Sequence, residues 1–343
     1  MPARPVDVSV VIVSYNAIDW LRRCLDAVTS VPTELNLEVV VVDNQSGPEV
    51  REYLAGRPHG VTTLQLEQNV GFGRACNFGI ERTTGTYVLL LNPDAIIQPG
   101  ALEALIGLYE QDPGRGLVGG RTLRPDGSLD PGSCWGRPTL WSYFCSAVGL
   151  TAVFRRSSFF DPESLGSWPR DSVREVDIVS GCLLLTSRTV WSQLGGFDPL
   201  FFMYGEDADL SIRAHLAGFR PAITPAATVI HALSATTGTP LAKQRLLLRG
   251  KVTLIRKHWP AARARSGIAV LIGGIAIRAG AEWLRRTEDT TMRTLLRERR
   301  DWSRGWLADP VLPRLAAGVP VPGAGDTAAT PPPGEATGTE RHR

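Results

Sequence analysis

The chain carries a carboxylate at a position suited to a metal ion. Asn92-Pro93-Asp94 directly follows the apolar run 87–91, so the acid projects beyond the end of a buried strand. Mg²⁺ and Mn²⁺ prefer oxygen ligands of this kind and complete their shells with phosphate oxygens and water. Because Asn, Pro and Asp are also turn formers, a simple capping turn is the alternative interpretation of this motif.

A second acidic motif, Glu206-Asp207-Ala208-Asp209, places three carboxylates within four residues. Such charges repel unless something pairs with them, and Arg213 lies four residues after Asp209, at helical pairing distance. A carboxylate held beside an incoming hydroxyl is a general base. The alternative is an ordinary helix start, where acids interact favourably with the helix dipole.

Asp43 and His231 are two further candidates. Asp43 ends the apolar run 38–42 and can accept a hydrogen bond from a ring N–H, as uracil and thymine offer; an Asx turn over 43–47 is the alternative. His231 ends the apolar stretch 226–230. A neutral imidazole can complete a metal site made of carboxylates, although a lone histidine after a strand is more often structural.

The segment from Asn69 to Asn77 contains glycines that precede a helix, where backbone amides can approach phosphate. It matches the dinucleotide-binding pattern GxGxxG only loosely, because Cys76 stands in place of the third glycine. The acid expected about twenty residues later is also missing. These departures disfavour a nicotinamide-dependent oxidoreductase.

The elements that position these residues follow from apolar periodicity. Continuous apolar runs predict buried strands, and intervening helical spacing predicts helices, which together indicate an α/β fold with a mostly parallel sheet. Residues 125–172 are rich in Pro, Gly, Ser and aromatics and predict irregular structure with short strands. The strands are expected at 8–13, 37–42, 61–66, 87–91 and within 176–186, and the helices at 20–28, 72–82, 98–108, 188–194 and 206–217.

Composition narrows the class of protein. The chain has 343 residues, 43% apolar and 21% charged, which is typical of a globular protein with a sizeable core. A net charge of +3 is too small to indicate a nucleic-acid partner. The five scattered cysteines have no CxxC spacing and predict reduced thiols in a cytoplasmic protein. The N-terminal apolar run is too short for a signal peptide.

Five segments, in this order, resemble the family 2 inverting glycosyltransferases over residues 7–235. The resemblance implies a GT-A fold, a three-layer αβα sandwich with a mostly parallel central sheet, followed here by a C-terminal helical extension. The segments are SVVIVSYN, VVVVDNQS, NVGFGRACNFGI, YVLLLNPDA and the run from Gly181 to Arg220.

The resemblance also implies roles for individual residues. Asp207 would be the general base, with Glu206 and Asp209 orienting it or the acceptor. Asp94 and His231 would hold a divalent metal, Mg²⁺ or Mn²⁺, with Asn92 replacing the first acid of the family's motif and weakening the site. The nucleotide-sugar, with Asp43 on its base, would be bound by Ser14, Tyr15, Asn16, Asp43, Asn69, Gly71, Phe72, Asn77, Asn92 and Asp94.

The branch with NPD and GGFDPLFFMYGEDADL is similar to rhamnosyltransferases of bacterial envelope polysaccharide. It implies transfer of a sugar to a hydroxyl of an envelope glycan or a lipid-linked acceptor. The sugar that the resemblance favours is L-rhamnose from dTDP-L-rhamnose, and a UDP-linked donor is the alternative. The alternative from another class is a catalytically silent nucleotide-sugar-binding subunit of an envelope-assembly complex, which a missing base or metal acid would favour. Both Asp94 and Asp207 are present.

The expected organisation is a glycosyltransferase domain at 1–237, in which residues 1–124 bind the nucleotide and residues 125–237 bind the acceptor. A helical region at 238–316 and a disordered tail at 317–343 follow. The apolar run Ser266–Ile277, flanked by arginines, is too short to span a membrane. It predicts either a helix at the inner face of the cytoplasmic membrane or one packed on the catalytic domain.

Overall fold

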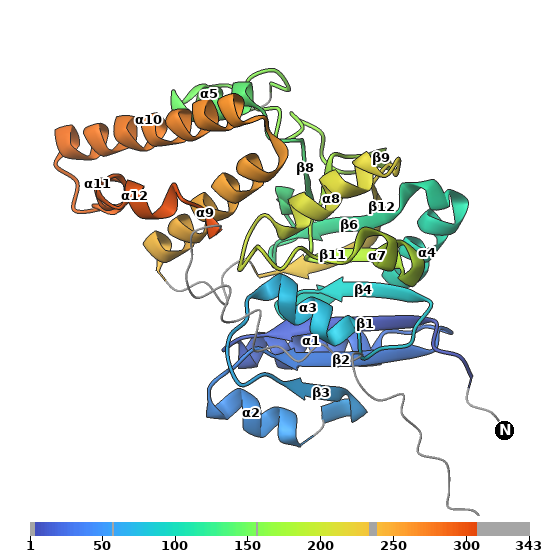
Figure 1. The fold of residues 1–343 in the computed structure, drawn as a ribbon. Coiled ribbons are helices and arrows are strands. Elements are labelled where there is room, and N and C mark those ends of the chain that lie inside the picture. Colours follow the sequence, from blue (N-terminus) through green and yellow to red (C-terminus); the bar gives the residue numbers. More distant parts are fainter. Residues whose placement is uncertain (1–3, 57, 156, 233–238, 307–343) are drawn as a thin grey trace, which may run out of the picture.

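The computed structural model describes residues 4–56, 58–155, 157–232 and 239–306, so the predicted tail at 317–343 lies outside the described residues. Strands and helices alternate over the N-terminal third of the chain (Figure 1), close to the predicted positions except for the helix Pro48–Ala55, which was not predicted. These elements are β1 (Val8–Ser14), α1 (Ile18–Ser30), β2 (Leu37–Asp43), α2 (Pro48–Ala55), β3 (Thr62–Gln65), α3 (Phe72–Ile80) and β4 (Tyr87–Leu91).

The central sheet has the strand order β3-β2-β1-β4-β11-β6-β12-β5. Its first four strands are parallel, as predicted, so their carboxyl ends share one edge. β11 (Leu183–Ser187) runs antiparallel between β4 and β6 (Leu117–Leu123), and β5 (Ala95–Ile97) runs antiparallel to β12 (Ala222–His231). Because β11 is reversed, the residues just before it lie where β4 ends.

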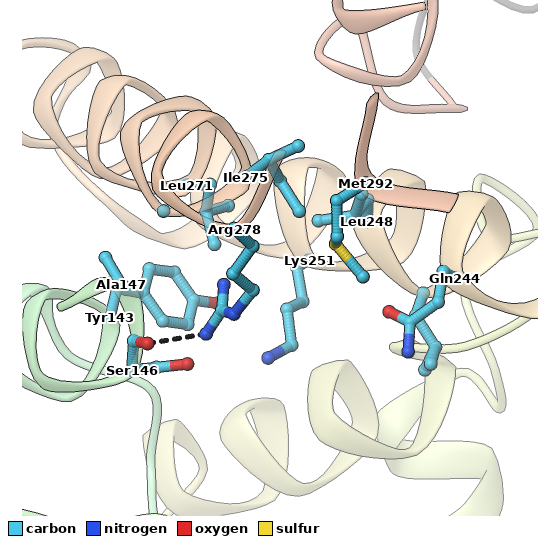
Figure 2. A pocket seen from close by; sticks show the side chains of 12 residues that line it. Tyr143, Ser146, Ala147, Gln244, Leu248, Lys251, Leu271, Ile275, Arg278 and Met292 are labelled. Atoms are coloured by element: carbon cyan, nitrogen blue, oxygen red, sulfur yellow. Dashed lines mark hydrogen bonds between the residues drawn. The ribbon is translucent and has the colours of Figure 1, made fainter. Parts of the chain in front are cut away.

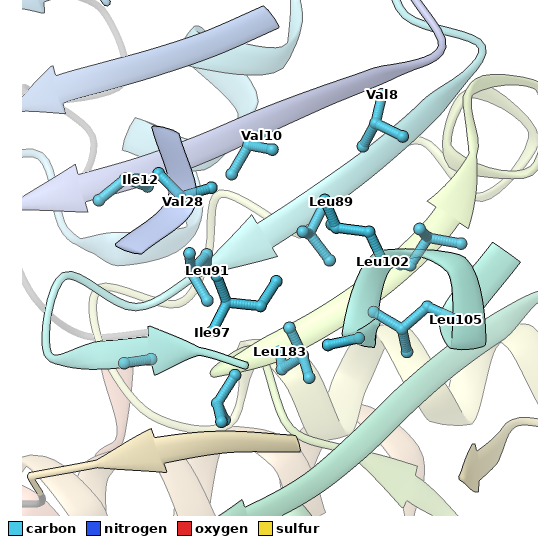
Figure 3. Close-up of a cluster of buried hydrophobic side chains, with 14 of the residues drawn as sticks. Val8, Val10, Ile12, Val28, Leu89, Leu91, Ile97, Leu102, Leu105 and Leu183 are labelled. Atoms are coloured by element: carbon cyan, nitrogen blue, oxygen red, sulfur yellow. The ribbon is translucent and has the colours of Figure 1, made fainter. Parts of the chain in front are cut away.

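Helices cover both faces of the sheet. Burial on both sides explains why most residues of β1 are apolar. Val10 and Ile12 point into one buried cluster, together with side chains of α1 and α4 (Ala101–Gln111). Figure 3 shows part of this cluster. Val11 and Val13 point into the opposite cluster, with α3, α7 (Arg188–Leu194) and α8 (Glu206–Leu216). Alternate side chains therefore face two cores, so the middle of the strand is apolar on both faces, while the buried Ser9 hydroxyl is hydrogen-bonded to Glu38 and the Gly85 N–H.

The segment after β6 contains the short strands β7 (Leu129–Asp130) and β8 (Cys134–Trp135), as predicted for 125–172. Beyond that range lie β9 (Arg174–Glu175) and β10 (Ile178–Val179), so the strand expected within 176–186 is divided between β10 and β11. Residues 125–172 also contain two helices that the composition did not predict, α5 (Leu140–Ala147) and α6 (Leu150–Val153). A capping box starts α5, because the Thr139 hydroxyl accepts from the Ser142 N–H while the Thr139 N–H donates to the Ser142 hydroxyl. Serine in place of the usual Glu or Gln makes that signal weak.

Four helices complete the described chain: α9 (Pro240–His258), α10 (Ala261–Arg285), α11 (Thr291–Arg297) and α12 (Arg299–Trp302). The apolar run expected to be too short for a membrane span sits inside α10, which has 25 residues. Within the described chain, α10 is the one helix whose length and composition would allow it to cross a membrane, and 22% of its most apolar window is buried. One side of α10 packs on α5 and α11 (Figure 1), and a packed helix passes the same test of length and composition.

Candidate active site

Two buried oxygens without hydrogen-bond partners lie at the carboxyl ends of β1 and β2. Ser14 and Asp43 are register neighbours there, and both are fully buried. The Asp43 Oδ1 accepts from the Ser46 N–H at 3.0 Å. Among the described residues, neither the Asp43 Oδ2 nor the Ser14 Oγ has a hydrogen-bond partner, and the Arg51 Nε lies 3.7 Å from that Oδ2. Unpaired buried oxygens are costly, so this edge is suited to a ligand that donates hydrogen bonds.

Asparagine side chains hold the loops around this edge. The Asn16 Oδ1 accepts from the Gly47 N–H at 2.7 Å. The Asn44 Oδ1 accepts from the Val70 N–H at 2.9 Å, and its Nδ2 donates to the Asn69 Oδ1 at 3.0 Å. Asn16 and Asn69 therefore engage other loops, whereas the neighbouring Tyr15 ring is 37% exposed. Asn44 is a positioning residue that the predicted site did not include.

Gly71 brings the loop before α3 against the loop that carries the acidic motif. Its φ is 88°, and a Cβ there would lie 2.2 Å from the Phe202 carbonyl oxygen. The Phe72 N–H donates to that same oxygen at 2.9 Å. Only glycine permits this approach. Asn77, predicted to border the ligand, instead has both ends of its amide bonded to the Phe197 backbone, at 2.8 and 3.0 Å.

Asp94 and His231 meet, as a shared metal site would require. β5 pairs with β12 so that Ala95 lies opposite His231, which places the histidine next to Asp94. The His231 Nε2 is 3.3 Å from the Asp94 Oδ1, and its Nδ1 is 3.2 Å from the Asp130 Oδ2. Asp130 was not predicted. Its Oδ1 accepts from the Gly132 N–H, and no local pattern separates it from a turn-forming Asp.

The electrostatics of this cluster favour a positively charged partner between two acids. Burial of the ring lowers the pKa of His231, but the neighbouring Cys182 and the carboxylates of Asp130 and Asp94 outweigh it and raise that pKa overall. Conversely, burial opposes ionisation of Asp130, but the His231 ring and the Gly132 N–H lower the pKa of that carboxyl. Without a metal, the protonated His231 ring is itself this cation, and a metal ion bound to the Nε2 would have to replace the proton there.

These residues form an incomplete set of ligands for a divalent ion. Within the described residues, no group of three or more His, Cys, Asp and Glu side chains is arranged to hold an ion. Asp94 and His231 can supply two ligands, and Asp130 accepts the other ring N–H, the partner that commonly orients a metal-bound imidazole. Mg²⁺ and Mn²⁺ usually take one or two carboxylates together with phosphate oxygens, so the remaining ligands would come from a phosphate-bearing substrate.

Asp207 lies at the start of α8, partly exposed. Its Oδ2 accepts from the Gly181 N–H at 3.3 Å and its Oδ1 from the Ala208 N–H at 2.8 Å. Burial raises the pKa of the Asp207 carboxyl, and these two N–H groups lower it by a smaller amount. The adjacent Glu206 is buried, faces Gly73 of α3, and has an Oε2 without a hydrogen-bond partner among the described residues.

The residues just before β11 connect the two acidic centres. The Gly181 N–H reaches Asp207, and the carbonyl of the next residue, Cys182, accepts from the Asn92 N–H at 3.0 Å. The reversed direction of β11 produces this arrangement, because its start lies beside the end of β4. Asp207 and the Asn92–Asp94 motif therefore border the same edge of the sheet. Neither Gly181 nor Cys182 was predicted to have a role.

Asp209 has a different environment from the one expected. Its fully buried carboxylate lies 2.8 Å from the Arg213 Nε, 2.6 Å from the Lys257 Nζ and 2.8 Å from the His258 Nε2. The last two residues belong to α9. Both oxygens of Asp209 are thus engaged in joining α8 to α9, so we assign it an anchoring role instead of contact with Asp207 or an acceptor.

Comparison with known proteins agrees with this geometry. The model of the family described as Glycosyl transferase family 2 matches residues 9–159. The chain is 32% identical over 254 residues, covering 67% of its own length and 77% of the relative, to N-acetylglucosaminyl-diphospho-decaprenol L-rhamnosyltransferase of Mycobacterium tuberculosis (strain ATCC 25618 / H37Rv). It is 25% identical over 212 residues, 61% of each chain, to the low-salt glycan biosynthesis hexosyltransferase Agl10 of Haloferax volcanii.

Solved structures show the same fold. The structure of GalNAc-T7 with UDP, GalNAc and Mn²⁺ aligns with a TM-score of 0.54 and 16% identity, over 91% of this chain and 58% of that one. The mannosyltransferase PcManGT from Pyrobaculum calidifontis, in complex with GDP-Man and Mn²⁺, aligns with a TM-score of 0.51 and 19% identity, over 92% and 87%. The predicted GT-A fold is confirmed.

Proposed function

The chain belongs to glycosyl transferase family 2, and we propose that it transfers L-rhamnose from dTDP-L-rhamnose to a hydroxyl of a lipid-linked sugar. The relative from M. tuberculosis is named for an L-rhamnosyl transfer to a sugar held on a decaprenyl diphosphate, which supports both the donor sugar and the acceptor class. Such an acceptor is embedded in a membrane, so the enzyme would work at the inner face of the cytoplasmic membrane.

The observation that carries the proposal is the position of the Gly181-Cys182 pair. The Gly181 N–H donates to Asp207, and the Cys182 carbonyl accepts from the backbone N–H of Asn92, two residues before Asp94. One dipeptide therefore contacts both the candidate base and the motif that carries the candidate metal acid. A transferase needs a base and a diphosphate-binding group around one sugar, because the attacking hydroxyl and the departing diphosphate lie on opposite faces of that sugar.

The donor would occupy the carboxyl edge of β1 to β4. The unpaired Asp43 Oδ2 would accept the ring N–H of the thymine base, and the Ser14 hydroxyl would bind nearby. Asp94 and His231 would hold the divalent ion with the donor phosphates. When bound, such an ion offsets the charge that develops on the leaving diphosphate.

Asp207 would then remove the proton from the acceptor hydroxyl as its oxygen attacks C1 of the sugar. The Gly181 and Ala208 N–H groups aim this carboxylate, and burial raises its pKa toward that of a useful base. Attack from the face opposite the diphosphate inverts the anomeric centre. Tyr15, which follows Ser14 in the chain, is exposed at the end of β1.

The test is product analysis with the purified full chain. dTDP-L-rhamnose and a panel of dTDP- and UDP-sugars would be incubated with Mg²⁺ or Mn²⁺ and a polyprenyl-diphospho-N-acetylglucosamine acceptor. Mass spectrometry should show one added deoxyhexose with dTDP-L-rhamnose, lost when the ion is chelated. Transfer of another sugar in preference to rhamnose would contradict the donor assignment, and full activity with a chelator would contradict the metal.

A further inference from the structure

A cavity of about 280 Å³ lies where α5, α9, α10 and α11 meet, outside the donor edge. Figure 2 shows its lining. Leu248, Leu271 and Ile275 form apolar walls, and the side chains of Lys251, Arg278 and Tyr143 enter the same space. Its volume is near the lower end of the range of small-molecule sites, roughly 300–1,000 Å³. It is therefore large enough for a small anionic group with a short stretch of an attached hydrocarbon.

The two cations of this cavity have no acidic partner in the part of the chain that the structure describes. Among the described residues, neither Lys251 nor Arg278 forms an ion pair. One Arg278 N–H group donates to the Ser146 carbonyl at 2.6 Å, and the Lys251 Nζ lies 5.4 Å from the centre of the Tyr143 ring. Two positive charges directed into one apolar space repel each other, and an anion between them would relieve that repulsion.

Tyr143 adds an unpaired hydrogen-bond donor. Its side chain is 1% exposed, and within the described chain its hydroxyl has no hydrogen-bond partner. Burial, and then the charge of Glu163, raise the pKa of Tyr143, so the hydroxyl keeps its proton at neutral pH. A buried hydroxyl beside two cations is suited to a ligand oxygen that accepts hydrogen bonds.

The cavity adjoins the loop that carries the candidate base. Gly250, which precedes Lys251 on α9, packs so closely on Tyr204 that a Cβ there would lie 2.1 Å from the Tyr204 carbonyl oxygen. Tyr204 is three residues before Asp207. The helix that carries Lys251 therefore packs on the loop that leads to Asp207, and the cavity lining includes neither Ser14 nor Asp43.

An exposed apolar surface continues from the cavity. Ala147 lines the cavity, and the next residue, Val148, is largely exposed. On the adjoining α6, Val153 is 73% exposed, and Phe154 follows it, also exposed. A hydrocarbon chain leaving the cavity in this direction would pass over apolar side chains.

We propose that this cavity binds the diphosphate of a prenyl-diphosphate-linked acceptor, with Lys251 and Arg278 on the phosphates and Leu248 and Ile275 beside the first prenyl unit. The proposal rests on the proposed function and specifies how its acceptor is recognised. Two cations match the charge of a diphosphate, and the apolar walls distinguish a lipid diphosphate from the free anion.

Binding can be measured without catalysis, in the full chain with its donor site filled by dTDP and Mg²⁺. Farnesyl diphosphate in detergent micelles should bind the wild type, and Lys251→Met and Arg278→Met should each weaken it about tenfold or more, as expected for a lost charge-assisted hydrogen bond. Farnesol and inorganic pyrophosphate should each bind much more weakly. Lys243→Met on α9 and Arg285→Met on α10 are matched controls outside the cavity and should bind like the wild type.

Kinetics give a second readout. Both cavity variants should raise KM for polyprenyl-diphospho-N-acetylglucosamine. KM for the donor should be unchanged, and so should the rate of transfer to an alkyl glycoside that has no phosphate. Farnesyl diphosphate binding that is unaffected by both variants would overturn the proposal, as would equally tight binding of farnesol or of pyrophosphate. If the wild type transfers sugar to no acceptor, the proposed function fails, while the binding measurement still tests the cavity.

Discussion

Asp94 and His231 are far apart in the chain and share one ion pair, whereas Glu206, Asp207 and Asp209 are near neighbours with three separate environments. The first pair meets because β5 runs antiparallel to β12. In the second group, neighbouring residues of one helix point in different directions. Glu206 is buried against α3, Asp207 is directed toward Gly181, and Asp209 is paired with residues of α9. The comparison shows that proximity in sequence is a poor guide to shared chemistry.

The strongest test of this contrast is Asp207→Asn. The substitution keeps the shape of the side chain but removes its basicity, so transfer should fall about 10²- to 10⁴-fold. Donor binding, followed by calorimetry with dTDP and Mn²⁺, should be retained. A variant that keeps wild-type turnover would place the base elsewhere.

Asp209→Asn should act on stability instead. It leaves Arg213, Lys257 and His258 without their buried carboxylate, and breaking a buried ion pair typically costs about 3–5 kcal/mol. Urea unfolding would measure this cost. Asp112→Asn is the matched control, because its pair with Arg220 is exposed at the surface and should contribute about 1 kcal/mol or less. Equal losses from the two variants would contradict the anchoring role of Asp209.

Asp130→Asn should lower the affinity for the metal ion without removing a metal ligand. The Asp130 carboxylate accepts from the His231 Nδ1 and so orients the ring, and the loss of such a partner typically costs about 10- to 100-fold in metal affinity. The readout is the Mn²⁺ concentration that gives half-maximal transfer, with turnover at saturating Mn²⁺ nearly unchanged. Asp126→Asn, at an exposed turn, should leave that concentration unaffected.

Glu206→Gln should change how stability depends on pH, with no loss of a ligand or of a charge pair. Burial, and then the charge of Asp207, raise the pKa of Glu206 from 4.5 to about 8. The folded protein therefore holds a proton that the unfolded chain releases above pH 4.5. This contribution to stability is complete below that pH and is lost as the pH rises through 8, by up to about 1.4 kcal/mol per pH unit.

The glutamine variant removes that proton exchange. Urea unfolding at pH 5, 7 and 9 should show a shallower decline of the unfolding free energy for Glu206→Gln than for the wild type. Parallel pH profiles for the two proteins would show that Glu206 ionises normally in the folded state.

The sequence by itself determined the α/β alternation, the first parallel strands and the family. β1 and β4 were predicted almost to the residue, because strands buried on both faces must be continuously apolar. The helix α7 was predicted at its observed bounds. These features depend on local patterns, so they can be read without knowing which segments meet.

The tertiary structure alone decided how the site residues combine. The reversed β11 brings Gly181 and Cys182 between the two acidic centres, and Asp130 of β7 reaches His231 of β12 because both strands pair with β6. The cavity of Lys251 and Arg278 forms only where α9 and α10 pack together. Such contacts join residues far apart in the chain, and nothing in the neighbourhood of either residue encodes its partner. Asp207 and Asp209 look alike in the sequence, and only the contacts of α8 with Gly181 on one side and with α9 on the other separate their roles.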